Sequence, residues 1–221
     1  MRPVALDDPA TSNAEWRSTA EELLASNGEQ ADLIDALLTL ASSEGGLSER
    51  ESVDFAPLVD ATLAGLQSDV ARLEIRVDDE ATTPAPFDGD ALLIERLVVN
   101  LLTNAVRHNT PGGRVEIETG IQEGEAFLSV SNTGPVIPSA EVERLFQPFQ
   151  RLDPRRAIHK DGHGLGLSIV RAIASAHGAS ITADPLPDGG LSVRVSFPSH
   201  TISAQSPRSN EHLSGTEFVA V

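Results

Sequence analysis

The stretch "DGHGLGLSIV", Asp161–Val170, places three glycines at alternate positions directly before an apolar segment with helical spacing. Glycine permits unusual backbone angles and lets a ligand approach the chain closely. Backbone N–H groups ahead of a helix also form a site for phosphate. Gly162, Gly164 and Gly166 therefore indicate a nucleotide-binding turn. The pattern matches neither G-x-G-x-x-G nor G-x-x-x-x-G-K-[ST], and a flexible surface turn explains this stretch equally well when it is taken alone.

Composition narrows the possible classes of partner. The 221 residues include 16 Lys and Arg against 33 Asp and Glu, a net charge of −17. Such a chain should repel nucleic acid and anionic membranes, and a polyanion such as ATP would need a metal ion and local cations. Without cysteine there is no disulfide, thiolate metal site or cysteine nucleophile. No apolar run approaches the roughly 18 residues of a membrane span, so we expect a cytoplasmic chain without a membrane segment.

The pattern divides the chain into four parts. Residues 1–12 are expected to be a flexible lead-in, and residues 13–48 form a helix with apolar residues three and four positions apart. This helix cannot bury its own apolar stripe, so it should pack on a partner helix. Residues 54–198 are predicted to form one α/β unit. Residues 199–221 are rich in serine and are predicted to be disordered.

Three helices and five strands are predicted in the α/β unit. The helices are "FAPLVDATLAGLQSDVA", "DGDALLIERLVVNLLTNAVRHN", of about six turns, and "LGLSIVRAIASAHG", which stops at Gly178. The strands are "RLEIRV", "RVEIET", "AFLSVSN", "ASITADP" and "GLSVRVSF", the last two forming a hairpin. Helices beside a mixed or antiparallel sheet define an α+β fold, a two-layer α/β sandwich.

The helix in "NLLTNAVRHN" presents polar groups on one face. Asn100, Asn104 and Arg107 stand at i, i+4 and i+7. The apolar positions that should face the core are Leu97, Leu101 and Leu102. Asparagine is unfavourable within a helix unless something binds it. The face therefore predicts a binding site, with a pair of satisfied structural amides as the alternative.

Two further stretches add polar and aromatic groups. In "SVSNTGPVIP", Asn132 ends a strand and Gly134 allows close backbone approach, so the amide should face a cavity beside the sheet. In "ERLFQPF", Phe146 and Phe149 are expected to anchor a loop to the core.

In chain order, "NLLTNAVRHN", "SNTGPVIP", "ERLFQPF" and "GHGLGLSIV" resemble the N box, first glycine box, F box and second glycine box of the sensor histidine kinases. These belong to the GHKL superfamily, with gyrase, the Hsp90 chaperones and the MutL repair proteins. The resemblance covers about residues 54–198 and implies the Bergerat ATP-binding fold. The segment "LIDALLTLASSEGGL" is also similar to the second helix of the kinase dimerisation hairpin, so residues 13–48 are interpreted as part of that hairpin.

The resemblance implies roles for the amide helix. Asn104 is expected to be the ligand of the Mg²⁺ ion that bridges the ATP phosphates, since an amide oxygen suits this cation. Asn100 would support it as a catalytic residue. Arg107 stands where the family usually has lysine and can still pair with phosphate. His108, in place of an aromatic residue, would stack on the base.

The resemblance also implies that the glycine boxes bind ATP. The expected cofactor-binding positions are Asn132, Gly134, Ile137, Gly162, His163, Gly164, Leu165, Gly166 and Leu167. Asn132 replaces the family's aspartate, but its carbonyl can still accept from the adenine amino group. Residues 150–161 are expected to be a lid over ATP, with Lys160 as a candidate catalytic contact to the γ-phosphate.

The implied function is the Mg·ATP-binding catalytic part of a histidine kinase, which transfers the γ-phosphoryl group to a histidine in two-component signalling. A response regulator and a homodimer, or pairing with an intact kinase hairpin, are the expected protein partners. Full-length relatives would be tethered to the inner face of the plasma membrane. None of the six histidines stands in the family's His-Glu-x-x-x-Pro acceptor motif, which makes autophosphorylation of this chain doubtful. The alternatives are a non-catalytic ATP-binding or dimerising fragment and a GHKL ATPase switch.

Overall fold

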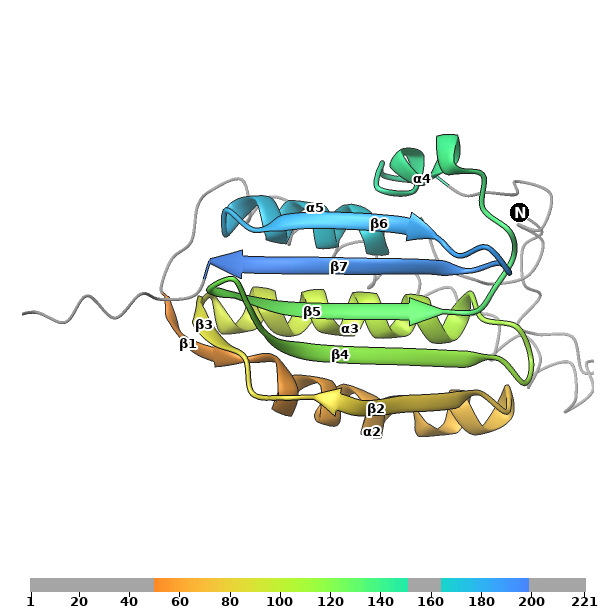
Figure 1. Cartoon of the computed structure of the whole chain (residues 1–221), viewed down its shortest axis with the longest axis horizontal. Helices are drawn as coiled ribbons and strands as arrows, with labels where there is room; N and C mark the ends of the chain where they lie inside the picture. Colours follow the sequence, from red (N-terminus) through yellow and green to blue (C-terminus); the bar gives the residue numbers. More distant parts are fainter. Residues whose placement is uncertain (1–49, 151–163, 199–221) are drawn as a thin grey trace, which may run out of the picture.

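The computed structural model describes residues 50–150 and 164–198. Its strands and helices are shown in Figure 1. In chain order they are β1 (Glu51–Asp54), α2 (Phe55–Arg72), β2 (Arg76–Thr82), β3 (Pro86–Gly89), α3 (Ala91–Arg107), β4 (Arg114–Gln122), β5 (Glu125–Asn132), α4 (Ser139–Leu145), α5 (Gly166–Ala176), β6 (Ser180–Pro185) and β7 (Leu191–Pro198).

The main sheet has five strands in the order β2-β4-β5-β7-β6 (Figure 1). Strand β2 pairs parallel with β4, and the other neighbours pair antiparallel. The short strands β1 and β3 form a separate antiparallel pair. The sheet is therefore mixed, as the sequence predicted.

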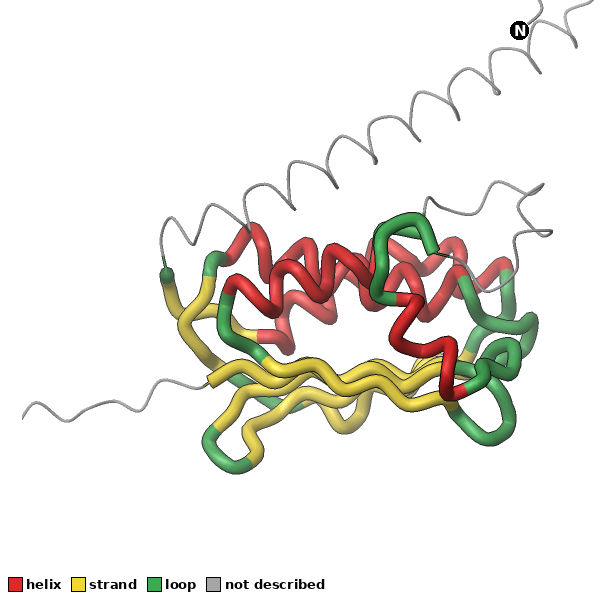
Figure 2. Tube along the Cα trace, turned by 90° about the horizontal axis from the view of Figure 1, so that it is seen from above, coloured by secondary structure: helices red, strands yellow, loops and turns green. Residues whose placement is uncertain are grey.

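The helices form a second layer on one face of the sheet, as Figure 2 shows. Side chains of β7 alternate between buried and half-buried, so one face of the strand packs on the helices. The largest fully buried side chains come from both layers: Phe55, Phe87, Phe197, Ile94, Leu97, Leu102, Ile117, Leu128 and Ile173. The predicted α+β two-layer sandwich is confirmed.

Aromatic rings close one end of the core. The ring centroid of Phe87 lies 4.7 Å from that of Phe55 and 4.6 Å from that of Phe197. Beside them, the buried His177 follows α5, and its Nε2 accepts a hydrogen bond from the Asp90 backbone N–H at 3.0 Å. Its Nδ1 lies 2.8 Å from the Ile173 carbonyl oxygen. His177 thus joins the end of α5 to the start of α3.

Aspartates begin the two long helices. The Asp54 carboxylate accepts from Ala56 N at 3.1 Å and from Ala85 N at 2.9 Å, so it caps α2 and also holds the approach to β3. The Asp90 carboxylate accepts from Leu93 N at 3.2 Å and caps α3. A carboxylate at these positions also complements the helix dipole.

Several predicted boundaries were wrong. The strand predicted from "RLEIRV" begins four residues later, at Arg76, because α2 continues to Arg72 and Glu74 takes a left-handed conformation with φ of 54°. Helix α3 spans 17 residues, fewer than the six turns expected. Helix α5 ends at Ala176, two residues before Gly178. The strands β1 and β3 and the helix α4 were not predicted.

Of the two phenylalanines expected to anchor a loop to the core, only Phe146 does so. Phe146 is 4% exposed, whereas Phe149 is 61% exposed. Phe149 also has a φ of 63°, a left-handed conformation that non-glycine residues seldom adopt.

The lead-in, the 13–48 helix, most of the lid and the tail predicted from the sequence lie outside the described residues. Among those described, no helix has the length and apolar character needed to cross a membrane.

Candidate nucleotide-binding site

Helix α3 places the predicted polar face at the edge of its buried stripe. Leu97 and Leu102 are fully buried, as predicted, and Leu101 is 2% exposed. Asn100 and Asn104 are half-buried, and Arg107 is exposed at the helix end. The Asn100 Nδ2 donates to the Arg96 carbonyl oxygen at 2.7 Å, which turns the amide oxygen away from its own helix backbone.

Gly166, the first residue of α5, lies against the side chain of Asn104. A Cβ added at Gly166 would stand 2.7 Å from Asn104 Nδ2 and 3.0 Å from Oδ1. Within the two described ranges the Asn104 side chain makes no hydrogen bond. Asn104 of the N box and Gly166 of the second glycine box are 62 residues apart in the sequence. The two motifs are therefore in contact through a glycine and an amide that has no partner among the described residues.

The loop after β5 packs on the C-terminal end of α3, one turn beyond Asn104. A Cβ added at Gly134 would stand 2.8 Å from the His108 carbonyl oxygen, so the first glycine box approaches the C-cap of α3 backbone to backbone. The Asn132 Nδ2 donates to the Thr133 carbonyl oxygen at 2.8 Å. Asn132 is half-buried and thus leaves its amide oxygen as the acceptor that a ligand can use.

The turn between β6 and β7 also contacts and supports this loop, a role that the sequence did not predict. Gly190 N donates to the Pro135 carbonyl oxygen at 2.9 Å. Gly189 and Gly190 have φ of 97° and 110°, and a Cβ on either would collide with the Gly134 or Asn132 carbonyl oxygen. The signal in the sequence is the doubled glycine of "LPDGG", residues 186–190, at the turn of the predicted hairpin.

The second glycine box is tied to the end of the F box. Phe149 N donates to the Gly164 carbonyl oxygen at 2.9 Å, and Gly164 has a φ of 69°. Leu165 and Ile137 are buried in the hydrophobic core, and Leu167 packs against it. These three side chains therefore anchor the two glycine boxes to the core.

The remaining predicted positions, Lys160, Gly162 and His163, lie outside the described residues. Within residues 50–150 and 164–198, no group of three or more His, Cys, Asp or Glu side chains is arranged to hold a metal ion.

This arrangement is found in known proteins. Residues 89–201 match the family described as histidine kinase-, DNA gyrase B-, and HSP90-like ATPase. The chain belongs to this family. It is similar to the sensor protein CutS of Streptomyces coelicolor, with 41% identity over 198 residues, which are 88% of this chain and 47% of CutS. The chain thus spans less than half the length of that relative.

Solved structures agree. The solved chain of the mycobacterial sensor histidine kinase MprB matches with a TM-score of 0.58 and 30% identity, over 68% of this chain and 97% of the solved chain. The solved chain of the histidine kinase ThkA, in a complex with the response regulator protein TrrA, matches with a TM-score of 0.64 and 23% identity, over 88% of this chain and 53% of the solved chain. The chain therefore contains a histidine kinase-type ATPase catalytic domain, and ATP is the ligand of that class.

Proposed function

We propose that this chain binds Mg·ATP between α3, the loop after β5 and the start of α5, and transfers the γ-phosphoryl group to a histidine. The observation that carries the proposal is the contact between Asn104 and Gly166. A helix start meets there an amide that has no hydrogen-bond partner among the described residues, and such a place offers donors to phosphate and an oxygen to a cation.

The residues present fit a magnesium ion accompanied by phosphate. Asn104 would hold the ion through its Oδ1, and Asn100 would support it. When bound, Mg²⁺ would neutralise phosphate charge and orient the γ-phosphoryl group. Arg107 would supply a positive charge to the phosphates within a protein that is strongly acidic overall. Asn132, Gly134 and Ile137 would bind the adenine base beside His108. Lys160, Gly162 and His163 would complete the phosphate contacts.

Phosphoryl transfer is favoured over hydrolysis because of the residue at position 100. In the GHKL ATPases a glutamate four residues before the metal-binding asparagine acts as the base for water. Asn100 cannot accept a proton at neutral pH. An incoming imidazole, which is itself a nucleophile, requires positioning more than activation.

The phosphoryl group would pass to a histidine of a dimerisation hairpin and then to a response regulator, the kind of protein bound by ThkA. We propose a homodimer or a pairing with an intact kinase hairpin as the working assembly, on the cytoplasmic side of the membrane.

The proposal is tested by calorimetry of ATP binding with and without Mg²⁺. Asn104→Ala should weaken Mg·ATP binding by about a hundredfold, since a charged ligand loses an oxygen contact to its cation. Glu95→Ala, at an exposed position of the same helix, is the matched control and should bind normally. Equal affinity of the Asn104 variant and the wild type would overturn the site.

Transfer is tested with γ-labelled ATP. The chain alone should show little acid-labile label, because no histidine stands in the acceptor motif. A supplied hairpin carrying His-Glu-x-x-x-Pro should become labelled. If ATP binds but the hairpin stays unlabelled, the chain is the non-catalytic ATP-binding fragment; release of phosphate without a hairpin would indicate the ATPase switch.

A further inference from the structure

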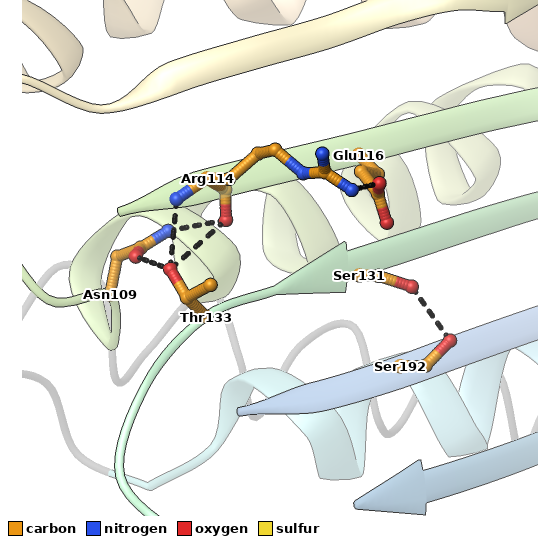
Figure 3. Close-up of polar contacts among 6 residues, drawn as sticks. All are labelled: Asn109, Arg114, Glu116, Ser131, Thr133 and Ser192. Atoms are coloured by element: carbon orange, nitrogen blue, oxygen red, sulfur yellow. Dashed lines mark hydrogen bonds and ion pairs between the residues drawn. The ribbon is translucent and has the colours of Figure 1, made fainter. Parts of the chain in front are cut away.

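A polar cluster ties the end of α3 to the loop that follows β5. Its members are Asn109, just beyond α3, Arg114, the first residue of β4, and Thr133, just beyond β5 (Figure 3). The Thr133 hydroxyl donates to Asn109 Oδ1 at 2.5 Å and accepts from Arg114 N at 2.8 Å. One hydroxyl thus joins two other segments.

The Asn109 amide is fully used. Its Oδ1 also accepts from Thr110 N at 2.9 Å, and its Nδ2 donates to the carbonyl oxygens of Ala105 at 3.2 Å and Arg114 at 3.1 Å. A primary amide has two donor hydrogens and two acceptor lone pairs, and all four are occupied. Asn109 therefore fixes the end of α3 and β4 in one arrangement.

The cluster depends on an absent side chain. Gly113 is buried, and a Cβ on it would collide with Asn109 Oδ1 and the Thr133 hydroxyl and lie 2.8 Å from the Thr110 carbonyl oxygen. Close polar packing of this kind is retained only where the groups satisfy one another.

We propose that Asn109 and Thr133 are a positioning pair for base recognition, an inference that rests on the proposed ATP site. Thr133 lies between Asn132, whose Nδ2 bonds to the Thr133 carbonyl oxygen, and Gly134, which packs on His108. Holding Thr133 therefore sets the direction of the Asn132 amide oxygen. That oxygen can accept from the adenine amino group but is repelled by the O6 acceptor of guanine.

The pair acts together with a second support. Gly189 and Gly190 restrain the same loop through its backbone, since Gly190 N donates to the Pro135 carbonyl oxygen. Neither Asn109 nor Thr133 needs to touch the nucleotide. Their effect is on selectivity between bases, because a loosened loop lets the Asn132 amide rotate and offer its NH₂ to guanine.

The test compares Thr133→Val, which keeps the shape and removes the hydroxyl, with Thr133→Ser, which restores the hydroxyl. The matched control is Ser131→Ala, two residues earlier in the chain. It removes a hydroxyl that donates to Ser192 Oγ at a distance of 2.8 Å and takes no part in the cluster (Figure 3). Dissociation constants for Mg·ATP and Mg·GTP are measured by calorimetry, and melting temperatures are recorded for each variant.

We expect Thr133→Val to lower the preference for ATP over GTP by about fivefold, the effect of one neutral hydrogen bond. Thr133→Ser should recover the preference and Ser131→Ala should keep it. A purely structural role would weaken both nucleotides equally and would overturn the inference, as would an unchanged preference. If the valine variant is unfolded, Asn109→Ala is measured in its place with the same expected loss. Failure of the wild type to bind either nucleotide would instead refute the proposed function.

Discussion

The first residue of α5, Gly166, packs directly on the Asn104 side chain, with room for a hydrogen but not for a methyl group: a Cβ would stand 2.7 Å from Asn104 Nδ2. The two helices that carry the proposed phosphate and metal contacts therefore meet at a position where only glycine fits. The amide of Asn104 keeps its orientation and its access to a ligand because Gly166 has no side chain.

Gly166→Ala should weaken Mg·ATP binding by about tenfold or more, because overpacking would displace the Asn104 amide. The matched control is Gly65→Ala in α2, where a Cβ meets nothing within 4 Å. That change should leave binding intact and stabilise the helix by about 0.5–1 kcal/mol. Calorimetry and urea unfolding measure both effects; equal binding by the two variants would contradict the packing described.

Gly190→Ala should both destabilise the protein and weaken nucleotide binding, because a Cβ there would strike the Asn132 carbonyl oxygen. The control separates this collision from backbone strain. Gly124 also has a positive φ, 81°, but faces open space. Gly124→Ala should therefore cost only about 1–2 kcal/mol of stability, the cost of a left-handed alanine, with no change in nucleotide affinity. Similar losses in both variants would show that the contact with Asn132 is unimportant.

Phe87→Ala should lower the free energy of unfolding by about 3–5 kcal/mol, since it opens a cavity in the aromatic end of the core. Phe149→Ala removes the same side chain from a position that is 61% exposed. Its unfolding free energy should change by less than about 1 kcal/mol. Denaturant titration compares the unfolding free energies of the two variants, provided that the dependence of this free energy on denaturant concentration is the same in both. A large loss of stability in Phe149→Ala would mean that the Phe149 ring is buried in solution.

His177 should make stability depend on pH. Burial lowers its pKa below 6.5, Arg50 lowers it further, and the Ile173 carbonyl and Asp90 act in the opposite direction. The unfolded state therefore binds a proton at higher pH than the folded state does. Stability from the neutral ring is complete above about pH 6.5 and is lost as pH falls below that value, with a slope of at most about 1.4 kcal/mol per pH unit.

Urea unfolding between about pH 5.5 and 7.5 checks this dependence, since that window excludes most carboxylate titrations. His177→Gln should flatten the profile. If the His177 variant keeps the full slope, another group is responsible.

The sequence was informative wherever periodicity and glycine placement acted together. The buried stripe of Leu97 and Leu102 follows from helical spacing, and strands β4, β5, β6 and β7 follow from alternation. The sequence predicted that Asn104 and Gly166 belong to the same site but not that they are in contact. The distance between two segments is set by tertiary packing and not by the local pattern of residues. The order of motifs supplied that information.

Other features had no local signal. The helix-to-strand junction at Glu74 needed a residue of positive φ, a conformation that glutamate seldom adopts. Strands β1 and β3 are four residues each, too short for alternation to identify them, and they pair with one another. Gly189 and Gly190 support the loop after β5 because β7 lies next to β5 in the sheet. The sequence of the turn alone does not give this strand order.

The last strand that the structure describes, β7, lies inside the sheet, between β5 and β6. During synthesis the sheet therefore stays in two pieces until residues 191–198 have left the ribosome. A chain that stops before Leu191 would expose unpaired edges on β5 and β6, along with the apolar faces of Leu128 and Val130. This domain is thus complete only after residues 191–198 have been made, and the loop after β5 gains its Gly189–Gly190 support only shortly before that moment.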